Sequence, residues 1–230
     1  MDLILVRHGL TDWNEQGRLM GRSDIELNTR GRAQVEAVAQ ALSDVPVGAV
    51  FASPQRRTQQ TAEAIARLHH LPVVAEPALA EVWLGRWLGL TWNEVREDPD
   101  VARYLADPTH ISDAFEPGTA VHERVVGFVE RLREHLRLRL HGRLRGDVRG
   151  EPDDTTVLVS HGDPLRILLA HFLSMPLASY RRLEVAPASV SVVRFDETFG
   201  TRVVLLNWRP QRDRDQLRPS TVRPGPLLVA

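Results

Sequence analysis

Two short runs of strand-forming residues in this chain are each followed by the dipeptide His-Gly. Residues 3–6 precede the dipeptide that contains His8, and residues 155–160 precede the one that contains His161. Runs of this length that are rich in apolar and β-branched residues indicate buried strands. In an open α/β sheet the carboxyl ends of parallel strands meet at one edge, where ligands bind. We therefore expect His8 and His161 to lie together at that edge.

The residues around the first His-Gly dipeptide suit phosphate chemistry. Arg7 offers a rigid fork of N–H donors that fits phosphate or carboxylate oxygens. The neutral imidazole of His8 beside it is a candidate nucleophile toward phosphorus, and Gly9 lets the chain turn sharply. A strand end with solvated polar side chains would explain one such motif. The second dipeptide, at His161, is harder to explain in that way.

The sequence contains neither lysine nor cysteine. These absences exclude a P-loop lysine, a Schiff-base lysine, a cysteine nucleophile and a thiolate metal site. Phosphate recognition must then depend on arginine, on backbone amides or on a metal. The net charge of −1 favours neither nucleic acid nor a membrane surface as a partner.

Nothing in the hydropathy pattern predicts membrane insertion. No apolar run approaches the roughly 20 residues that span a bilayer. The first three residues, Met1-Asp2-Leu3, carry no basic leader and lead directly into a strand. We therefore expect no signal peptide and a cytoplasmic location.

Two adjacent arginines follow the predicted strand at residues 47–52. Ser53 is predicted to cap a helix there, because serine suits the N-cap and the proline after it suits the first helical position. On that helix Arg57 shares a face with Thr61, whereas Arg56 lies on a polar face. The facing predicts that Arg57 alone points toward the site, near a helix N-terminus that favours anions.

Glu81 stands before an apolar, glycine-punctuated stretch, residues 82–90. A carboxyl group that is half-buried among such residues has a raised pKa, which suits a general acid. Read alone, a glutamate at this position would usually be a surface residue.

The remaining pattern alternates helices and strands. We expect helices at 28–42 (capped by Asn28 or Thr29), 121–140 and 164–173, a strand at 71–75, short helical pieces within 91–122, a polar loop at 142–154 and a hairpin of 190–195 with 202–206.

Together with Thr11, Trp13 and Asn14, the Arg7-His8-Gly9 stretch resembles the opening motif of the histidine phosphatase superfamily, also called the phosphoglycerate mutase-like family. Four further family landmarks follow in order, and the resemblance extends from residue 2 to about residue 208. They are Gly21-Arg22-Ser23-Asp24 with Leu27 and Gly31, the Ser-Pro-x-x-Arg-x-x-Gln-Thr-Ala pattern at 53–62, Glu81 with its glycine-punctuated stretch, and Ser160-His161-Gly162.

The resemblance implies an α/β fold, a three-layer sandwich with a mostly parallel central sheet flanked by helices. It also implies one domain at residues 1–208, in which residues 82–122 form a small cap insertion that sets substrate choice. Residues 209–230, rich in proline and arginine, are expected to form a C-terminal tail.

The resemblance further implies a role for each site residue. His8 would attack phosphorus and form a phosphohistidine, and Glu81 would protonate the leaving oxygen. Arg7, Arg57 and His161 would hold the phosphoryl oxygens. Additional phosphate contacts would come from Thr11, Asn14 and Gly21. No metal and no cofactor would be needed, and the substrate would be a small phosphorylated metabolite.

Two positions depart from the family pattern. Leu10 stands where many members carry Glu, and Gly118-Thr119-Ala120 stands where many carry Gly-Glu-Ser. The second departure makes the usual contact from that point doubtful.

Three alternative functions compete with a phosphomonoester hydrolase. A cofactor-dependent phosphoglycerate mutase shares the first step, but residues 79–85 lack the Arg-Leu-Asn-Glu-Arg-His-Tyr-Gly segment of such mutases. A non-catalytic phosphate-binding protein would need neither His8 nor Glu81. A metal hydrolase lacks a His-Glu-x-x-His spacing. The physiological substrate and a homodimeric state stay open.

Overall fold

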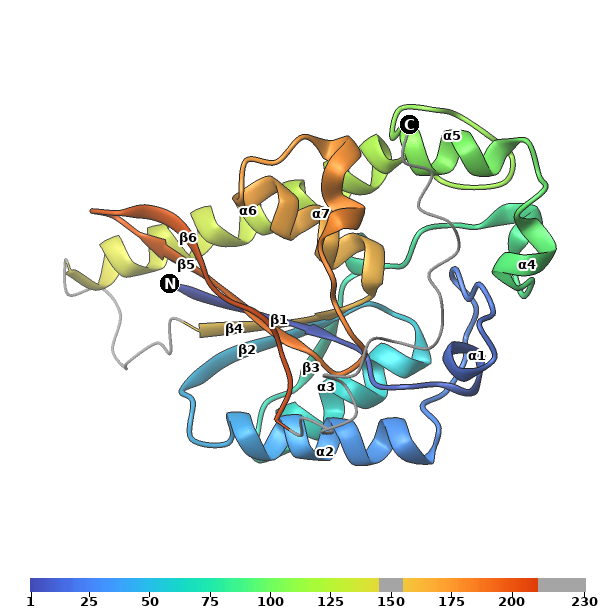
Figure 1. The fold of residues 1–230 in the computed structure, drawn as a ribbon. Coiled ribbons are helices and arrows are strands. Elements are labelled where there is room, and N and C mark those ends of the chain that lie inside the picture. Colours follow the sequence, from blue (N-terminus) through green and yellow to red (C-terminus); the bar gives the residue numbers. More distant parts are fainter. Residues whose placement is uncertain (145–154, 211–230) are drawn as a thin grey trace.

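A six-stranded sheet forms the centre of the molecule (Figure 1), in a computed structural model that describes residues 1–144 and 155–210. The strand order is β3-β2-β4-β1-β5-β6. The strands are β1 (Asp2–Arg7), β2 (Val47–Ala52), β3 (Val73–Ala75), β4 (Thr155–Ser160), β5 (Val190–Asp196) and β6 (Gly200–Trp208). The first four are parallel to one another, and β5 and β6 form an antiparallel hairpin against β1.

Helices cover both faces of this sheet (Figure 1). One face carries α2 (Thr29–Leu42) and α3 (Arg56–Leu68), and the other carries α6 (Gly118–Leu144) and α7 (Gly162–Phe172). Alternate residues of β1 enter two separate apolar cores, Leu3 and Leu5 on one face and Ile4 and Val6 on the other. This period of two is the signature of a strand buried on both faces. The predicted three-layer α/β sandwich is confirmed.

The register of the two central strands brings the His-Gly dipeptides together. β1 and β4 are parallel neighbours with Arg7 paired to Ser160, so His8 and His161 each leave the sheet at the same level. The His8 amide also donates to the Ser160 carbonyl at 3.1 Å. Gly9 is required just beyond, because a Cβ there would lie 2.7 Å from the Gly31 carbonyl oxygen of α2.

The segment predicted to cap the site has a small aromatic core of its own. It holds α4 (Trp92–Val95), α5 (Asp100–Ala106) and a 3-10 turn, Gly85–Trp87. The Trp87, Tyr104 and Phe115 rings pack together, with centroids 4.7–5.5 Å apart. In Figure 1 this segment lies toward the end of the sheet at which β1 and β4 finish. Its description as an insertion in one domain stays a prediction.

The structure corrects the predicted start of α3. Ser53 does not cap this helix; the N-cap position is Gln55, whose side chain makes no capping hydrogen bond, and the helix starts at Arg56. Ser53 instead directs its hydroxyl at His161. Serine is favoured at N-caps because its oxygen can accept from backbone amides, and the same oxygen serves here as a partner for an imidazole.

Other boundaries differ by a few residues. The helix predicted at 121–140 is longer, Gly118–Leu144, so residues 142–144 are helical where a loop was expected. Its arginine- and leucine-rich sequence favours continuation of the helix. The strand predicted at 71–75 is shorter, since Pro72 has no N–H for the ladder. The helix predicted from Pro164 begins at Gly162, because proline is tolerated in a first turn.

The remaining elements are short. They are α1 (Asp12–Glu15) and two 3-10 helices, Pro77–Leu79 and Leu177–Arg182. The helix predicted at 28–42 is present and is capped by the Asn28 side chain. The rest of the predicted 142–154 loop and nearly all of the 209–230 tail lie outside the described residues. Within the described part of the chain, no helix has the length and apolar character to cross a membrane.

Candidate active site

His8 is fully buried at the end of β1, and its ring is held at both nitrogens. Nδ1 lies 2.7 Å from the Gly9 carbonyl oxygen, and Nε2 accepts from Arg57 Nε at 3.3 Å. A carbonyl can only accept, so we assign the proton to Nδ1 and a free lone pair to Nε2. Burial and then the charges of Arg57 and Arg7 hold the pKa of His8 well below its usual value. His8 is therefore neutral, with the unprotonated ring nitrogen at Nε2.

Arg57 is the arginine of α3 that reaches His8. Its side chain is fully buried, and its two terminal nitrogens donate to the carbonyls of Ser23 at 2.7 Å and Gly21 at 2.8 Å. Gly21 has a positive φ of 46°, a conformation that favours glycine. Arg56 points outward, 55% exposed, and pairs with Glu26 at 2.8 Å. The helical periodicity of the sequence predicted that Arg57, and not Arg56, points toward the site.

Two buried nitrogens at the site have no partner within the described residues, Arg7 Nε and His161 Nδ1. Arg7 is anchored through Nη1, which donates to the Val185 carbonyl at 2.6 Å. The His8 and His161 rings meet edge to face, with centroids 5.2 Å apart. Buried polar atoms are seldom left unpaired. These two therefore mark positions where the oxygens of a bound anion would complete the site.

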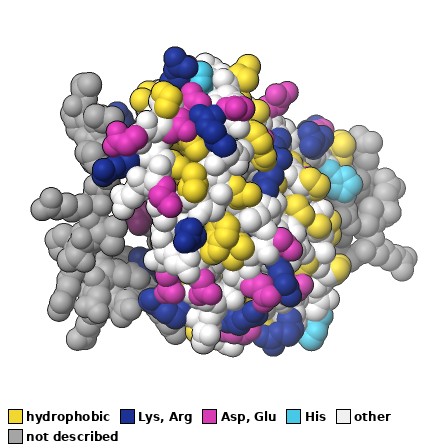
Figure 2. Space-filling view, turned by 90° about the vertical axis from the view of Figure 1, so that its right-hand side faces the viewer, with side chains coloured by type: hydrophobic (Ala, Val, Ile, Leu, Met, Phe, Trp, Pro, Cys, Tyr) yellow, Lys and Arg dark blue, Asp and Glu magenta, His cyan; other side chains and the backbone are white. Residues whose placement is uncertain are grey.

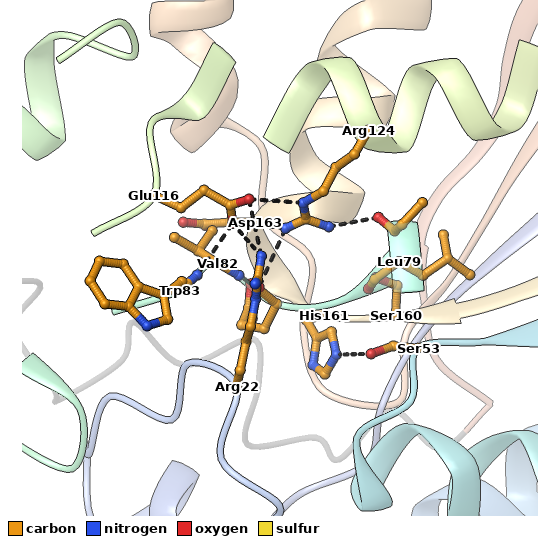
Figure 3. A network of polar contacts seen from close by, with 12 residues as sticks. Arg22, Ser53, Leu79, Val82, Trp83, Glu116, Arg124, Ser160, His161 and Asp163 are labelled. Atoms are coloured by element: carbon orange, nitrogen blue, oxygen red, sulfur yellow. Dashed lines mark hydrogen bonds and ion pairs between the residues drawn. The ribbon is translucent and has the colours of Figure 1, made fainter. Parts of the chain in front are cut away.

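Ser53 and Gln55 hold His161 in place and are site residues that the sequence did not reveal. His161 Nε2 lies 2.7 Å from Ser53 Oγ and 2.9 Å from Gln55 Oε1, and the two side chains also bind each other. Figure 3 shows the Ser53 contact. The sequence offered one indication of their role: Ser53 and Gln55 stand four and two residues before Arg57, within the same family landmark.

Thr11 and Asn14 bind each other in the present geometry. The Asn14 amide donates to Thr11 Oγ1 and the Thr11 amide donates to Asn14 Oδ1, both at 3.1 Å, which caps α1. Thr11 Oγ1 also lies 3.2 Å from the Met20 sulfur. Their predicted hydrogen bonds to phosphate stay a prediction.

Glu81 follows the 3-10 helix Pro77–Leu79 and belongs to the same electrostatic environment. The charges of Arg57 and Arg7 both act on its carboxyl group. Burial and then the charge of Asp163 raise the pKa of Glu81, and they outweigh the Val82 amide, which donates to Oε1 at 2.9 Å. A carboxyl group with a raised pKa retains its proton closer to neutral pH, as a general acid requires.

The backbone of Glu81 is held by two arginines that share a carboxylate (Figure 3). Its carbonyl accepts from Arg22 Nε at 3.0 Å and from Arg124 Nη2 at 3.3 Å. Both guanidinium groups also bind Glu116, at 3.0 Å each. Arg124 further donates to the Ala78 carbonyl at 2.6 Å. This cluster joins α6, the Glu81 turn and the loop that carries Gly21.

Asp163, two residues after His161, joins α7 to the cap segment. It accepts from Tyr104 Oη at 2.8 Å and from Arg166 at 2.9 Å. The Arg181 guanidinium lies over the Tyr104 ring, 4.1 Å from its centroid. Burial raises the pKa of Asp163, but the charges of Arg181 and Arg166 outweigh burial and lower it. The carboxyl group of Asp163 is therefore ionised at neutral pH, and its charge acts on Glu81.

Candidate metal ligands do not cluster at this site. Among residues 1–144 and 155–210, no group of three or more His, Asp or Glu side chains has the arrangement to hold a metal ion. The cationic groups around His8 are Arg57, which is fully buried, and Arg7, which is partly buried. Burial lowers the pKa of each to about 10, so both stay charged at neutral pH.

The arrangement is therefore a neutral imidazole near two arginines, with a second histidine and a protonatable carboxyl group in the same environment. The profile of the histidine phosphatase superfamily (branch 1) matches residues 3–209. The chain belongs to this superfamily. The five motifs on which the resemblance rested all lie at the carboxyl edge of the sheet or in the loops around it.

Relatives within the superfamily carry different substrate names. Phosphoserine phosphatase 1 of Hydrogenobacter thermophilus is 32% identical over 200 residues, 85% of this chain and 87% of that protein. The probable phosphoglycerate mutase GpmB of Erwinia tasmaniensis is 30% identical over 195 residues, 84% of each chain. The structure of the alpha-ribazole phosphatase of Shigella flexneri superposes with a TM-score of 0.76 at 28% identity, covering 91% of this chain and 97% of that one. The protein is thus an enzyme of the histidine phosphatase superfamily with phosphatase-named relatives.

Proposed function

We propose that this protein hydrolyses phosphate monoesters of small metabolites through a phosphohistidine on His8. The observation that supports this most strongly is the state of the His8 ring. Its Nδ1 proton is held by the Gly9 carbonyl, which leaves the Nε2 lone pair directed into the site beside Arg57. A neutral, oriented imidazole is the form that attacks phosphorus.

In the first step His8 Nε2 bonds to phosphorus and the bond from phosphorus to the ester oxygen breaks. Arg57 Nε, the free Arg7 Nε and His161 Nδ1 would hold the three phosphoryl oxygens, over which negative charge is spread in the transition state. His161 needs a proton on Nδ1 to donate there. Burial and the charge of Arg57 lower its pKa, and a bound dianion would raise it again.

Glu81 would supply the proton to the leaving oxygen. In the second step its carboxylate would take a proton from the attacking water, the P–N bond would break, and His8 would return to its neutral form. Charge neutralisation is assigned to the arginines and His161, so activity is expected to survive exhaustive treatment with EDTA.

A phosphoglycerate mutase is a second candidate, because one relative is named as a probable mutase. It would share His8 and return the phosphoryl group to a sugar acid instead of water. The two are separated by supplying 3-phosphoglycerate with 2,3-bisphosphoglycerate: a mutase gives 2-phosphoglycerate, and a phosphatase releases inorganic phosphate.

The proposed function is tested by a panel of phosphorylated metabolites with inorganic phosphate as the readout, in EDTA, for the wild type and His8→Ala. We expect phosphate release by the wild type and none above background by the variant. Release that needs an added divalent ion would contradict the metal-free assignment, and equal release by both proteins would contradict the role of His8.

A further inference from the structure

The cluster of Arg22, Glu116 and Arg124 lies next to Glu81. Both arginines donate to the Glu81 carbonyl, and Glu81 is the proposed donor to the leaving oxygen. Arg22 is also the neighbour of Gly21, whose carbonyl binds Arg57. A group attached to the ester oxygen would therefore extend toward this cluster.

Both arginines already form ion pairs with a carboxylate of the protein itself. Arg22 contacts both oxygens of Glu116 at 3.0 Å, and Arg124 contacts the same two oxygens at 3.1 and 3.0 Å. The Glu116 side chain is 14% exposed and the Arg124 side chain 18%, so solvent competes little for the contacts between these two, whereas the Arg22 side chain is 41% exposed. Partial burial raises the pKa of Glu116, but the hydrogen bond and charge of Arg124 and the charge of Arg22 outweigh it and lower that pKa. The carboxylate thus stays ionised.

Other arginines near the phosphate position are paired in the same way. Arg166 and Arg181 both lie within salt-bridge distance of Asp163, at 2.9 and 3.7 Å. Apart from Arg7 and Arg57, the described arginines around the site therefore each pair with a carboxylate: Arg22 and Arg124 with Glu116, and Arg166 and Arg181 with Asp163. A second anionic group on the substrate would lie against the Glu116 carboxylate, because Arg22 and Arg124 are already paired with it. The repulsion between the two like charges would disfavour such a substrate.

The surface beside the cluster suits a neutral group. The Trp83 amide donates to Glu116 Oε2 at 3.3 Å, and Trp83 itself is 43% exposed. Leu88 is also exposed and reaches the Gly21 side of the site. Figure 2 views the molecule from the side toward which β1 and β4 point, and hydrophobic side chains are spread across the middle of that face between charged ones.

We propose that Glu116 is a specificity-determining residue: as an internal carboxylate on Arg22 and Arg124, it selects phosphate esters of neutral alcohols and disfavours leaving groups that carry a carboxylate or a second phosphate. This inference rests on the proposed function. It separates the chain from relatives whose named substrates carry a carboxylate, as phosphoserine does.

The test compares two alkyl phosphates of equal length, glycerol 3-phosphate and 3-phosphoglycerate, which differ in a neutral CH₂OH against a carboxylate. For the wild type we expect the higher kcat/KM with glycerol 3-phosphate. Glu116→Gln removes the charge and keeps the size, and it should shift the ratio of the two kcat/KM values toward 3-phosphoglycerate by roughly 10-fold or more.

Glu26→Gln is the matched control. Glu26 also bridges two arginines, Arg32 at 2.9 Å and Arg56 at 2.8 Å, but on the outer side of α2 and α3. This variant should leave the ratio unchanged, and a shift equal to that of Glu116→Gln would overturn the inference by showing a general charge effect.

Two further outcomes would overturn it. One is a higher kcat/KM of the wild type with 3-phosphoglycerate than with glycerol 3-phosphate. This measurement does not depend on the folding of any variant. The other is a folded Glu116→Gln protein, judged by its thermal transition, with the wild-type ratio. Absence of hydrolysis of both esters and of every other ester in the panel would instead refute the proposed function, and this inference with it.

Discussion

Arg57 Nε donates to His8 Nε2 at 3.3 Å, so the proposed nucleophilic atom faces a cation. The same guanidinium is fixed at its other end by the Gly21 and Ser23 carbonyls. A phosphoryl group that entered between them would exchange this contact for one to its own oxygens. The arrangement is therefore preorganised for the charge that develops during transfer.

The first prediction separates the two arginines of α3. Arg57→Ala removes a buried donor at the phosphoryl group and should lower kcat by roughly 10²–10³-fold or more. Arg56→Ala removes one exposed ion pair with Glu26 and should change kcat less than about 2-fold, because such pairs contribute little. Steady-state rates of phosphate release check both variants. A reversed ranking would show that Arg56, and not Arg57, serves the site.

The second prediction concerns Glu81 as the proton donor. Glu81→Gln keeps the size of the side chain and removes the acid. Formation of the phosphoenzyme from an alkyl phosphate should slow by about 10²–10⁴-fold. Phosphorylation by p-nitrophenyl phosphate should slow far less, because p-nitrophenolate leaves without a proton.

Single-turnover measurement with both substrates is needed for this comparison, since Glu81 is also proposed to assist the water step and steady-state rates would mix the two steps. Equal slowing with both substrates would mean that Glu81 has a structural role and that the acid lies elsewhere.

The third prediction follows from the negative charge of Asp163 beside Glu81. Burial and then this charge raise the pKa of Glu81. Activity on alkyl phosphates requires the protonated acid, so it is present below that pKa and is lost as the pH rises through it. Asp163→Asn removes the charge, lowers the pKa of Glu81 and should move the alkaline limb of kcat/KM to lower pH.

Asp98→Asn is the control for this shift. Asp98 binds Arg86 and Trp87 within the cap segment. The limb of this variant should coincide with that of the wild type. A limb that stays in place in Asp163→Asn would show that Asp163 serves only the contacts to Tyr104 and Arg166.

The parts of the site that follow from local geometry could be predicted from the sequence. Strand ends in a parallel sheet bring His8 to His161, and the helical repeat separates Arg57 from Arg56. Both rules act over a few residues or between adjacent strands. The fold class followed from the family resemblance, whereas the ends of elements such as α6 were misplaced and short elements such as α1 were not predicted.

The partners of His161 could not be predicted, because they depend on contacts across the chain. Ser53 and Gln55 are 108 and 106 residues away from it. A serine before a proline fits an N-cap equally well, so the local rule gave the wrong role. Glu116 was missed for the same reason, since it meets Arg22 over a separation of 94 residues.

The phosphorylated intermediate tests the central claim most directly. Wild-type protein mixed with labelled substrate and quenched in alkali within milliseconds should carry label that survives base, is lost in acid and maps to the peptide containing His8. His8→Ala should carry no label and show no turnover. Full turnover by that variant, or label on a peptide without His8, would contradict the account.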